Sequence, residues 1–296
     1  MTAKLFAADP GGAAPALVRH INGGNLWNLP ESSSAPADPQ EQLMALHKAG
    51  VVSIQHPFPQ MLPPSPLTLT GMGRVDAPDD ADRIAKEHKE QGLVCTTLHV
   101  GSGLETDDQI DQLVSAVIEA SAKRDYPLFI ETHRATTTQD IRRTLDMVER
   151  FPDVRFNADL SHWYTGHEMT YGDIAAKFNA MQPVFDRVRY MHGRIGTPCC
   201  AQVALTGASD DREFVGHFRE MWRRCMQGFS STAEPDEVLP FAPELLPYEL
   251  DVGGTTHKLY YMRRFSGSGA EESDRWEQAF VLFEIAEQCW RELSSS

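Results

Sequence analysis

Four short apolar segments of the sequence each end near a carboxylate or an imidazole. They are LFIETHR at Leu128–Arg134, VRFNADLSH at Val154–His162, VRYMHGR at Val188–Arg194 and VLPFAPE at Val238–Glu244. The residues that recur in this position are Glu131, Asp159, His192 and Glu244. Three carboxylates and one imidazole would form a site with mostly oxygen ligands, which suits Mn²⁺, Mg²⁺ or Co²⁺ and is compatible with Zn²⁺. We therefore expect these four residues to bind one divalent metal ion.

The spacing of the four residues fits strands that alternate with helices. Their separations are 28, 33 and 52 residues (159 − 131, 192 − 159 and 244 − 192). The first two match one strand–helix unit each, and the third matches one unit with an insertion at 196–211. Side chains at the carboxyl ends of successive parallel strands meet at one face of an α/β barrel. Each carboxylate alone could instead cap the following helix, but all four residues lie at the ends of consecutive predicted strands, which favours a shared site.

Strand and helix patterns alternate along the rest of the chain, with Asp38 and Pro39 forming a typical helix start. Besides the four segments above, predicted strands are Lys4–Ala8, Val51–Gln55, Leu93–Leu98 and, as an eighth strand or part of a hairpin, Lys258–Arg263. Predicted helices are Asp38–Lys48, Asp79–Glu90, Thr106–Lys123, Thr137–Arg150, Tyr171–Arg187, Phe214–Met226 and Asp274–Leu293. Pro57–Arg74 is expected to be a long loop over the barrel mouth. We predict a single (β/α)8 TIM barrel domain over residues 1–296.

Composition excludes several classes of partner. The chain has 27 basic and 42 acidic residues, a net charge of −15, which disfavours binding to a nucleic-acid backbone. The five cysteines are scattered without a CxxC pair, so neither a disulfide framework nor a zinc ribbon is expected. No apolar run reaches the length of a membrane span. We expect a cytoplasmic protein that binds a small molecule, with no nucleic-acid or membrane partner; a homodimer is compatible with the sequence.

The segments ETHR, DLSHW, HGRIG and PE together resemble the xylose-isomerase-like TIM barrels, the sugar-phosphate isomerase/epimerase superfamily. The resemblance runs from about Val51 to the last predicted helix. It implies that the four residues above bind one divalent metal, with Mn²⁺ as the first expectation. It also implies that His162, three residues after Asp159, and Arg194, two residues after His192, hold the substrate.

The chemistry implied by this resemblance is the isomerisation or epimerisation of a sugar or related polyol ketone. A metal next to a carbonyl oxygen stabilises an enediolate anion after a proton leaves the adjacent carbon. Glu131 and Glu244 could serve as ligands and as the acid/base pair. Arg194 and His162 would hold substrate oxygens through charge-assisted hydrogen bonds, and we expect both to contact substrate more than they stabilise the fold.

Further residues have two interpretations each. His99 and Trp163 are predicted to bind substrate, although His99, like His56 and His133, could be a structural histidine and Trp163 could pack in the core. Glu249 is a rival to Glu244 as the fourth ligand; we prefer Glu244 because it closes the apolar run. Two neighbouring thiols could lie near the metal or belong to loop packing, namely Cys199 and Cys200.

Several other functions are alternatives to an isomerase. A lyase or dehydratase that eliminates a β-leaving group from a keto-sugar, keto-glycoside or inosose-like substrate would need the same metal and base. The DNA-repair endonuclease branch of the superfamily is disfavoured by the acidic charge. A non-catalytic barrel is disfavoured because all four expected ligands are present. Phosphate-loop and dinucleotide-binding motifs are absent from the sequence, so no redox cofactor is expected.

Overall fold

A computed structural model of the chain describes residues 14–252, 254–265 and 268–293. Eight parallel strands form a closed barrel in sequence order, and the first strand pairs with the eighth. The strands are β1 (Ala16–Asn22), β2 (Val51–Gln55), β3 (Thr68–Val75), β4 (Thr96–Val100), β5 (Leu128–Glu131), β6 (Phe156–Ala158), β7 (Val188–Gly193) and β8 (Val238–Pro243). The predicted TIM barrel is therefore confirmed.

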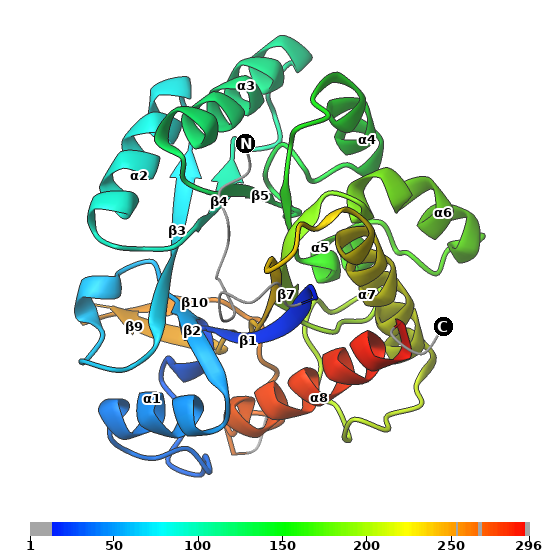
Figure 1. Ribbon diagram of the computed structural model, residues 1–296. Coiled ribbons are helices and arrows are strands. Elements are labelled where there is room, and N and C mark those ends of the chain that lie inside the picture. Colours follow the sequence, from blue (N-terminus) through cyan, green and yellow to red (C-terminus); the bar gives the residue numbers. More distant parts are fainter. Residues whose placement is uncertain (1–13, 253, 266–267, 294–296) are drawn as a thin grey trace.

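Helices surround the strands, as Figure 1 shows. They are α1 (Pro39–Lys48), α2 (Pro78–Glu90), α3 (Asp107–Arg124), α4 (Ile141–Arg150), α5 (Leu160–Gly166), α6 (Ile174–Phe185), α7 (Glu213–Thr232) and α8 (Arg275–Leu293). The connection from β2 to β3 holds the 3-10 turn η2 (Pro59–Met61) in place of an α-helix. An antiparallel hairpin, β9 (Glu249–Val252) and β10 (Thr255–Lys258), follows β8 outside the barrel.

Side-chain caps explain where several helices begin. Asp38 accepts a hydrogen bond from the Glu41 N–H at 3.0 Å and Pro39 occupies the first position of α1, as predicted. Helix α4 begins later than the predicted Thr137, because Asp140 is its cap. The intervening Thr138 has another function: its hydroxyl donates to the Glu131 carbonyl at 2.6 Å, which holds the end of β5 in place.

Two barrel strands differ from the prediction. The predicted first strand, Lys4–Ala8, lies outside the described residues, and β1 is found at Ala16–Asn22. The predicted loop at 57–74 contains most of β3, so the segment with Glu131 is the fifth strand and not the fourth. Gly71 hides this strand in the sequence, yet the fold requires it: a Cβ there would lie 2.5 Å from His88 Nδ1.

The predicted eighth strand at Lys258–Arg263 is wrong, although its alternative as part of a hairpin is close to the structure. Only Lys258 of that segment belongs to β10, and β10 pairs with β9 alone. The barrel still has eight strands, because β1 and β3 are two strands that the sequence did not reveal.

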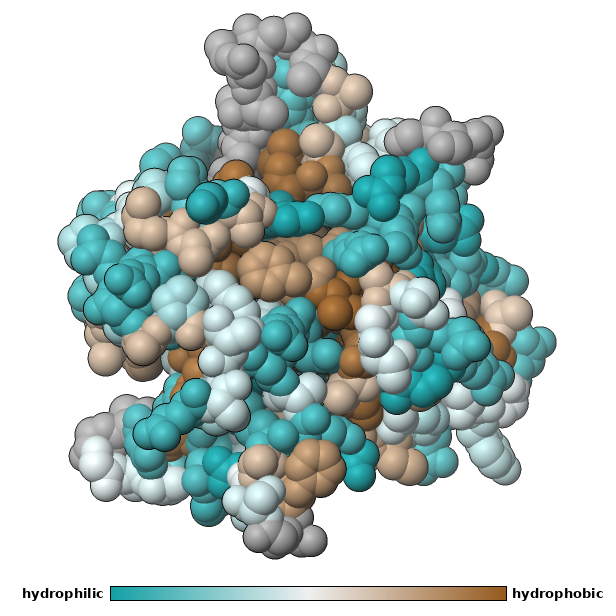
Figure 2. Space-filling view, turned by 90° about the horizontal axis from the view of Figure 1, so that it is seen from below, coloured by the Kyte–Doolittle hydropathy of each residue, from teal (hydrophilic) through white to brown (hydrophobic). Residues whose placement is uncertain are grey.

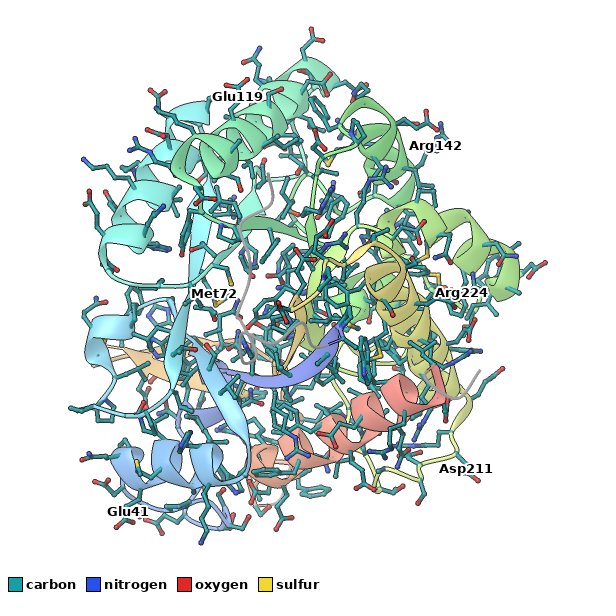
Figure 3. All side chains as sticks on the ribbon, in the orientation of Figure 1. Glu41, Met72, Glu119, Arg142, Asp211 and Arg224 are labelled. Carbon is teal, nitrogen blue, oxygen red and sulfur yellow. The ribbon has the colours of Figure 1, made fainter. Side chains whose placement is uncertain are left out.

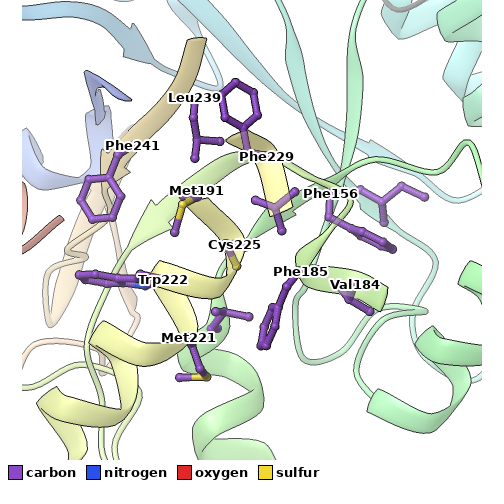
Figure 4. Packing of buried hydrophobic residues seen from close by; sticks show 14 of the residues in the cluster. Phe156, Val184, Phe185, Met191, Met221, Trp222, Cys225, Phe229, Leu239 and Phe241 are labelled. Carbon is purple, nitrogen blue, oxygen red and sulfur yellow. The ribbon is translucent and has the colours of Figure 1, made fainter. Parts of the chain in front are cut away.

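Apolar residues form two separate cores. The outer core lies between the barrel wall and the helices, and Figure 4 shows Met191 and Phe241 of the strands beside Trp222 and Cys225 of α7. The inner core is smaller and fills the barrel itself with four residues: Cys95, Phe129, Tyr190 and Ala242. Side chains packed inside the barrel are usual for this fold, whose active sites lie at the carboxyl ends of the strands.

A buried arginine of the last helix binds the loop that follows β1. Arg275 is fully buried, and its guanidinium donates to the carbonyls of Gly24, Asn25 and Trp27 at 2.7–3.0 Å. These residues form the turn η1 (Gly23–Leu26) and its cap, directly after β1. The last helix therefore holds the loop that follows the first strand.

The surface is largely hydrophilic on the face that Figure 2 displays. Charged side chains such as Glu119, Arg142 and Asp211 project outward and are exposed, as Figure 3 shows. Met72 instead points toward the barrel, where its sulfur accepts a hydrogen bond from Asn22 at 3.6 Å. Among the described helices, none combines the length and the apolar character needed to cross a membrane.

Candidate metal centre

Four consecutive strands bring the predicted metal ligands together. Glu131 is the last residue of β5, Asp159 follows β6, His192 lies near the end of β7 and Glu244 follows β8. All four are buried, and each offers a ligand atom within 4.8 Å of the others. We call these residues the four-residue cluster. The structure thus places every predicted ligand at one end of the barrel.

The cluster attracts positive charge. His192 Nδ1 lies 3.3 Å from Glu244 Oε2 and 3.6 Å from Glu131 Oε1. Burial lowers the pKa of His192, but the carboxylates of Glu244 and Glu131 outweigh it and raise the pKa to about 10. The same position is suited to a metal cation, which would replace the proton on this nitrogen.

Unsatisfied atoms show that the four-residue cluster fits a metal. His192 Nε2 lies 2.6 Å from Gln55 Oε1 and 3.0 Å from Asn157 Nδ2, and these amides orient the ring so that Nδ1 faces the carboxylates. His192 Nδ1, Glu131 Oε2 and Glu244 Oε2 are buried; within the described part of the chain they form ion pairs at 3.2–3.3 Å but no hydrogen bond. Buried polar atoms are normally paired, so these atoms are placed as ligands are.

A layer of polar side chains beneath the cluster orients it, and the sequence did not reveal this layer. Asn22 donates to Glu244 Oε1 at 3.0 Å and to Gln55 Oε1 at 2.9 Å. Gln55 in turn donates to Thr97 at 3.0 Å, and Asn157 donates to the same hydroxyl at 3.2 Å. The available signal was a polar residue at the end of an apolar run, as in VVSIQ.

Arg194 stabilises the cluster more than the sequence predicted. Its side chain is 1% exposed and forms ion pairs with Asp159 and, at 3.2 Å, with Glu244. Burial lowers its pKa, but these two carboxylates raise it further above its ordinary value. Arg194 also donates to Ser161 Oγ at 2.9 Å. Arg194 therefore also neutralises buried carboxylates, and the expectation that it contacts substrate more than it stabilises the fold stays a prediction.

His162 lies on the short helix α5 and not on the preceding strand, which ends at Ala158. Its Nε2 accepts a hydrogen bond from Arg194 at 2.9 Å. Burial, and then the positive charge of Arg194, hold the pKa of His162 well below its usual value. His162 is therefore a neutral acceptor that positions Arg194, and a substrate contact for it stays a prediction.

The two other predicted substrate contacts lie differently. His99 Nε2 is 3.3 Å from Glu131 Oε2, and its side chain is 29% exposed, so this imidazole borders the cluster. Trp163 is fully buried in the outer core, and its indole donates to the Thr138 carbonyl at 2.7 Å. The position of Trp163 favours core packing over contact with a sugar.

Other candidates lie apart from the four-residue cluster. His56 Nδ1 accepts a hydrogen bond from the Phe58 N–H at 2.9 Å, and the Trp27 indole nitrogen lies 3.4 Å from Nε2, contacts that favour a structural histidine. The potential metal groups among the described residues include neither Cys199 nor Cys200, which favours the loop-packing interpretation.

An aromatic ring lies against Arg194, beside the four-residue cluster. The Arg194 guanidinium lies 4.7 Å from the centre of the Tyr261 ring, and Arg134 approaches the same ring at 5.5 Å. Tyr261 follows the β9–β10 hairpin, so this hairpin segment reaches over the carboxyl ends of the strands. A cation is attracted to the face of an aromatic ring, and this attraction holds the hairpin segment against the barrel.

We expect Glu249→Gln to keep its metal and Glu244→Gln to lose most of it. Glu244 belongs to the cluster, whereas Glu249 pairs with Lys258 and, at 3.0 Å, with Arg264 on the hairpin. Elemental analysis of the two purified variants after dialysis against Mn²⁺ measures the difference. Metal loss in the Glu249 variant alone would assign the fourth ligand to the hairpin.

Comparisons with known proteins identify the fold. No family model matches the sequence, and no curated protein matches it. A xylose isomerase-like TIM barrel protein from Mycobacterium smegmatis, solved in complex with magnesium, has a TM-score of 0.53 and 12% identity, covering 93% of this chain and 97% of that chain. The probable 3-DHS dehydratase AsbF from Bacillus anthracis has a TM-score of 0.48 and 12% identity over 78% and 93% of the two chains. Endonuclease IV from Thermus thermophilus has a TM-score of 0.46 and 10% identity over 94% and 100%.

Proposed function

We propose that this barrel of the xylose-isomerase-like fold is a divalent-metal-dependent isomerase or epimerase of a sugar or related polyol ketone. The observation that carries the proposal is the four-residue cluster. Three buried carboxylates and one imidazole direct ligand atoms to one place at the strand ends, within 4.8 Å of one another. This donor set suits a hard divalent cation.

The residues of the cluster would hold the metal and move the proton. When bound, the metal would supply positive charge that stabilises an enediolate formed from a hydroxy ketone. Among the described residues, Glu131 Oε2 and Glu244 Oε2 accept no hydrogen bond; each forms an ion pair, with His99 at 3.3 Å and with Arg194 at 3.2 Å respectively. Each carboxylate therefore keeps an oxygen that can take a proton from the substrate carbon next to the carbonyl or return it.

Arg194 and His99 are the side chains best placed to contact the substrate beside the cluster. Arg194 Nη1 is buried without a hydrogen-bond partner, although the other nitrogens of its guanidinium bind Ser161 and Asp159. A substrate oxygen would satisfy this donor. His99 lies on the more exposed side of Glu131 and would donate to a second oxygen.

Mn²⁺ is the metal we propose first, since it accepts both carboxylate and imidazole ligands. Magnesium in the M. smegmatis protein of similar fold supports a hard divalent ion at this kind of barrel. The net charge of −15 supports a small-molecule substrate over a nucleic acid.

We expect the reaction to exchange hydrogen at the carbon beside the carbonyl. The test is a screen of ketoses, inososes and keto-glycosides with the metal-loaded protein, followed by turnover in D₂O and, in parallel, turnover of a substrate deuterated at that carbon. Wash-in, deuterium migration or a primary isotope effect supports an enediolate, because the parallel substrate reveals internal return of the proton. Turnover with none of the three contradicts it and favours metal-assisted hydrolysis.

A lyase or dehydratase remains the alternative function, because elimination begins with the same proton abstraction. The mass of the product separates the two reactions. An isomerase or epimerase conserves the mass of its substrate, whereas the product of a dehydratase is lighter by one water.

A further inference from the structure

The hairpin segment that follows β8 is bonded mainly to itself. We use this name for residues 248–252 and 254–265. Within the described part of the chain, the hydrogen bonds and ion pairs of these residues have both partners inside residues 248–272. Glu249, for example, pairs with Lys258 and Arg264 of the same segment. None of these bonds ties the segment to a barrel strand or to a surrounding helix.

Tyr261 connects the hairpin segment to the barrel. The centre of its ring lies 4.7 Å from the Arg194 guanidinium and 5.5 Å from that of Arg134. Arg194 follows β7 and Arg134 follows β5, so one ring bridges two strand ends. Met262 is buried beside Tyr261, but it belongs to neither apolar core. The attachment therefore depends on contacts that are individually weak.

The site next to Tyr261 is closed in this conformation. The four residues of the cluster are each at most 5% exposed, and Arg194 is 1% exposed. Arg194 Nη1 nevertheless has no hydrogen-bond partner among the described residues. A molecule with several carbon atoms can reach this buried donor only after a neighbouring group has moved. The hairpin segment is the neighbour of Arg194 that no hydrogen bond holds to the barrel.

The backbone next to Tyr261 is strained while the ring lies against Arg194. Tyr260 has a φ of +59°, in the left-handed region, which is unfavourable for a residue with a Cβ. Its ring is largely exposed and packs on Tyr248 of the same segment. Strained residues of this kind are found at sites that switch between conformations. Movement of Tyr261 away from Arg194 would allow Tyr260 to relax, which favours opening.

We propose that Tyr261 is the gating residue of the site. Its ring latches the hairpin segment against Arg194, and a substrate-sized molecule reaches Arg194 when the ring moves away. The segment moves as one unit because its hydrogen bonds are internal. That the entering molecule is a sugar or polyol ketone rests on the proposed function, whereas the latch rests on its own contacts.

Chemical labelling of Arg194 tests the gate without metal or substrate. Phenylglyoxal, a small dicarbonyl selective for arginine, is added to the full metal-free chain, and labelled peptides are quantified by mass spectrometry. Arg189 is the internal control, because it is buried on the same strand and binds Thr232 instead of the hairpin segment. We expect low urea to leave the labelling rate of Arg194 almost unchanged and to raise that of Arg189, since a local opening exposes little surface. An equally steep urea dependence at both arginines would overturn the gate.

Substitutions of Tyr261 distinguish a cation–ring latch from simple coverage. Tyr261→Phe keeps the ring and should label as wild type does. Tyr261→Leu keeps an apolar cover but loses the ring, so Arg194 should be labelled about tenfold faster, equivalent to about 1.4 kcal/mol from two cation–ring contacts. Tyr171→Leu, at an 82%-exposed tyrosine between α5 and α6, should change nothing. Unchanged labelling in Tyr261→Leu, or an equal rise at Arg189, would contradict the proposal.

Hydrogen exchange shows whether the hairpin segment itself opens. The amides of residues 254–265 should exchange faster in Tyr261→Leu by the same factor as the labelling, while those of β7 keep their wild-type rates. Hairpin amides that exchange as in wild type would overturn the latch. Neither measurement uses metal or turnover. Failure of the latch therefore leaves the proposed reaction untouched, and a protein without activity on ketoses would still show the latch.

Discussion

Glu131→Gln is expected to lose most of its metal and to lower kcat/KM by at least roughly 10³-fold, within the range of removing an acid/base group. The change keeps the shape of the side chain but removes a charge that faces His192 and His99. Burial raises the pKa of Glu131, but His192 and His99 outweigh it and hold the pKa well below its usual value. Glu131 is therefore ionised, and an amide cannot replace it as a ligand or as a base.

Elemental analysis and steady-state kinetics measure this effect. Glu237→Gln is a matched control, because Glu237 is 7% exposed, precedes β8 at the opposite end of the barrel and accepts a local hydrogen bond from the Glu234 N–H at 3.1 Å. The control should keep both its metal and its activity. Full occupancy and turnover in the Glu131 variant would exclude the four-residue cluster as the active centre.

Arg194→Ala is expected to lower the free energy of unfolding of the metal-free protein by about 3–5 kcal/mol. The loss follows because Asp159 and Glu244 are buried and the substitution removes the cation that pairs with both. Saturating Mn²⁺ should restore part of the stability, since a bound cation neutralises the same carboxylates and stabilises the folded state. The kcat/KM should also fall by orders of magnitude.

Urea unfolding with chelator and with Mn²⁺ measures both parts of this effect. Arg189→Ala serves as a control, since Arg189 is also buried on β7 but donates to backbone carbonyls and to Thr232. Its stability loss should be independent of metal. If Arg194→Ala leaves unfolding unchanged while activity disappears, Arg194 contacts substrate more than it stabilises the fold, and the predicted stability loss is wrong.

The sequence predicts the four-residue cluster because each ligand ends an apolar run, and the barrel brings strand ends together. It does not predict the polar layer beneath, since Asn22 lies in a segment interrupted by glycines and Gln55 is a single amide at a strand end. The burial of Arg194 is also hidden, because an arginine beyond a strand could face solvent or carboxylates. The packing of several strands decides whether the Arg194 side chain faces solvent or the buried carboxylates.

The fold is predicted best where one local signal is sufficient. Helices with a strong cap, such as the one that Asp38 begins, are found to within about a residue. Strand β3 is missed because Gly71 and Gly73 are typical of loops, whereas here α2 and β4 approach too closely for side chains. The sequence alone does not show how closely α2 and β4 approach β3.

The first strand and the loop after it depend on contacts with residues near the end of the chain, including Arg275, and this affects folding during translation. Asn22, which orients Glu244, must find a partner 222 residues later in the chain. The first strand pairs with the eighth, so a nascent chain that lacks β8 leaves an edge of β1 unpaired. Contacts this distant form slowly. During translation, the edge of β1 that pairs with β8 therefore stays open until residues 238–243 have emerged.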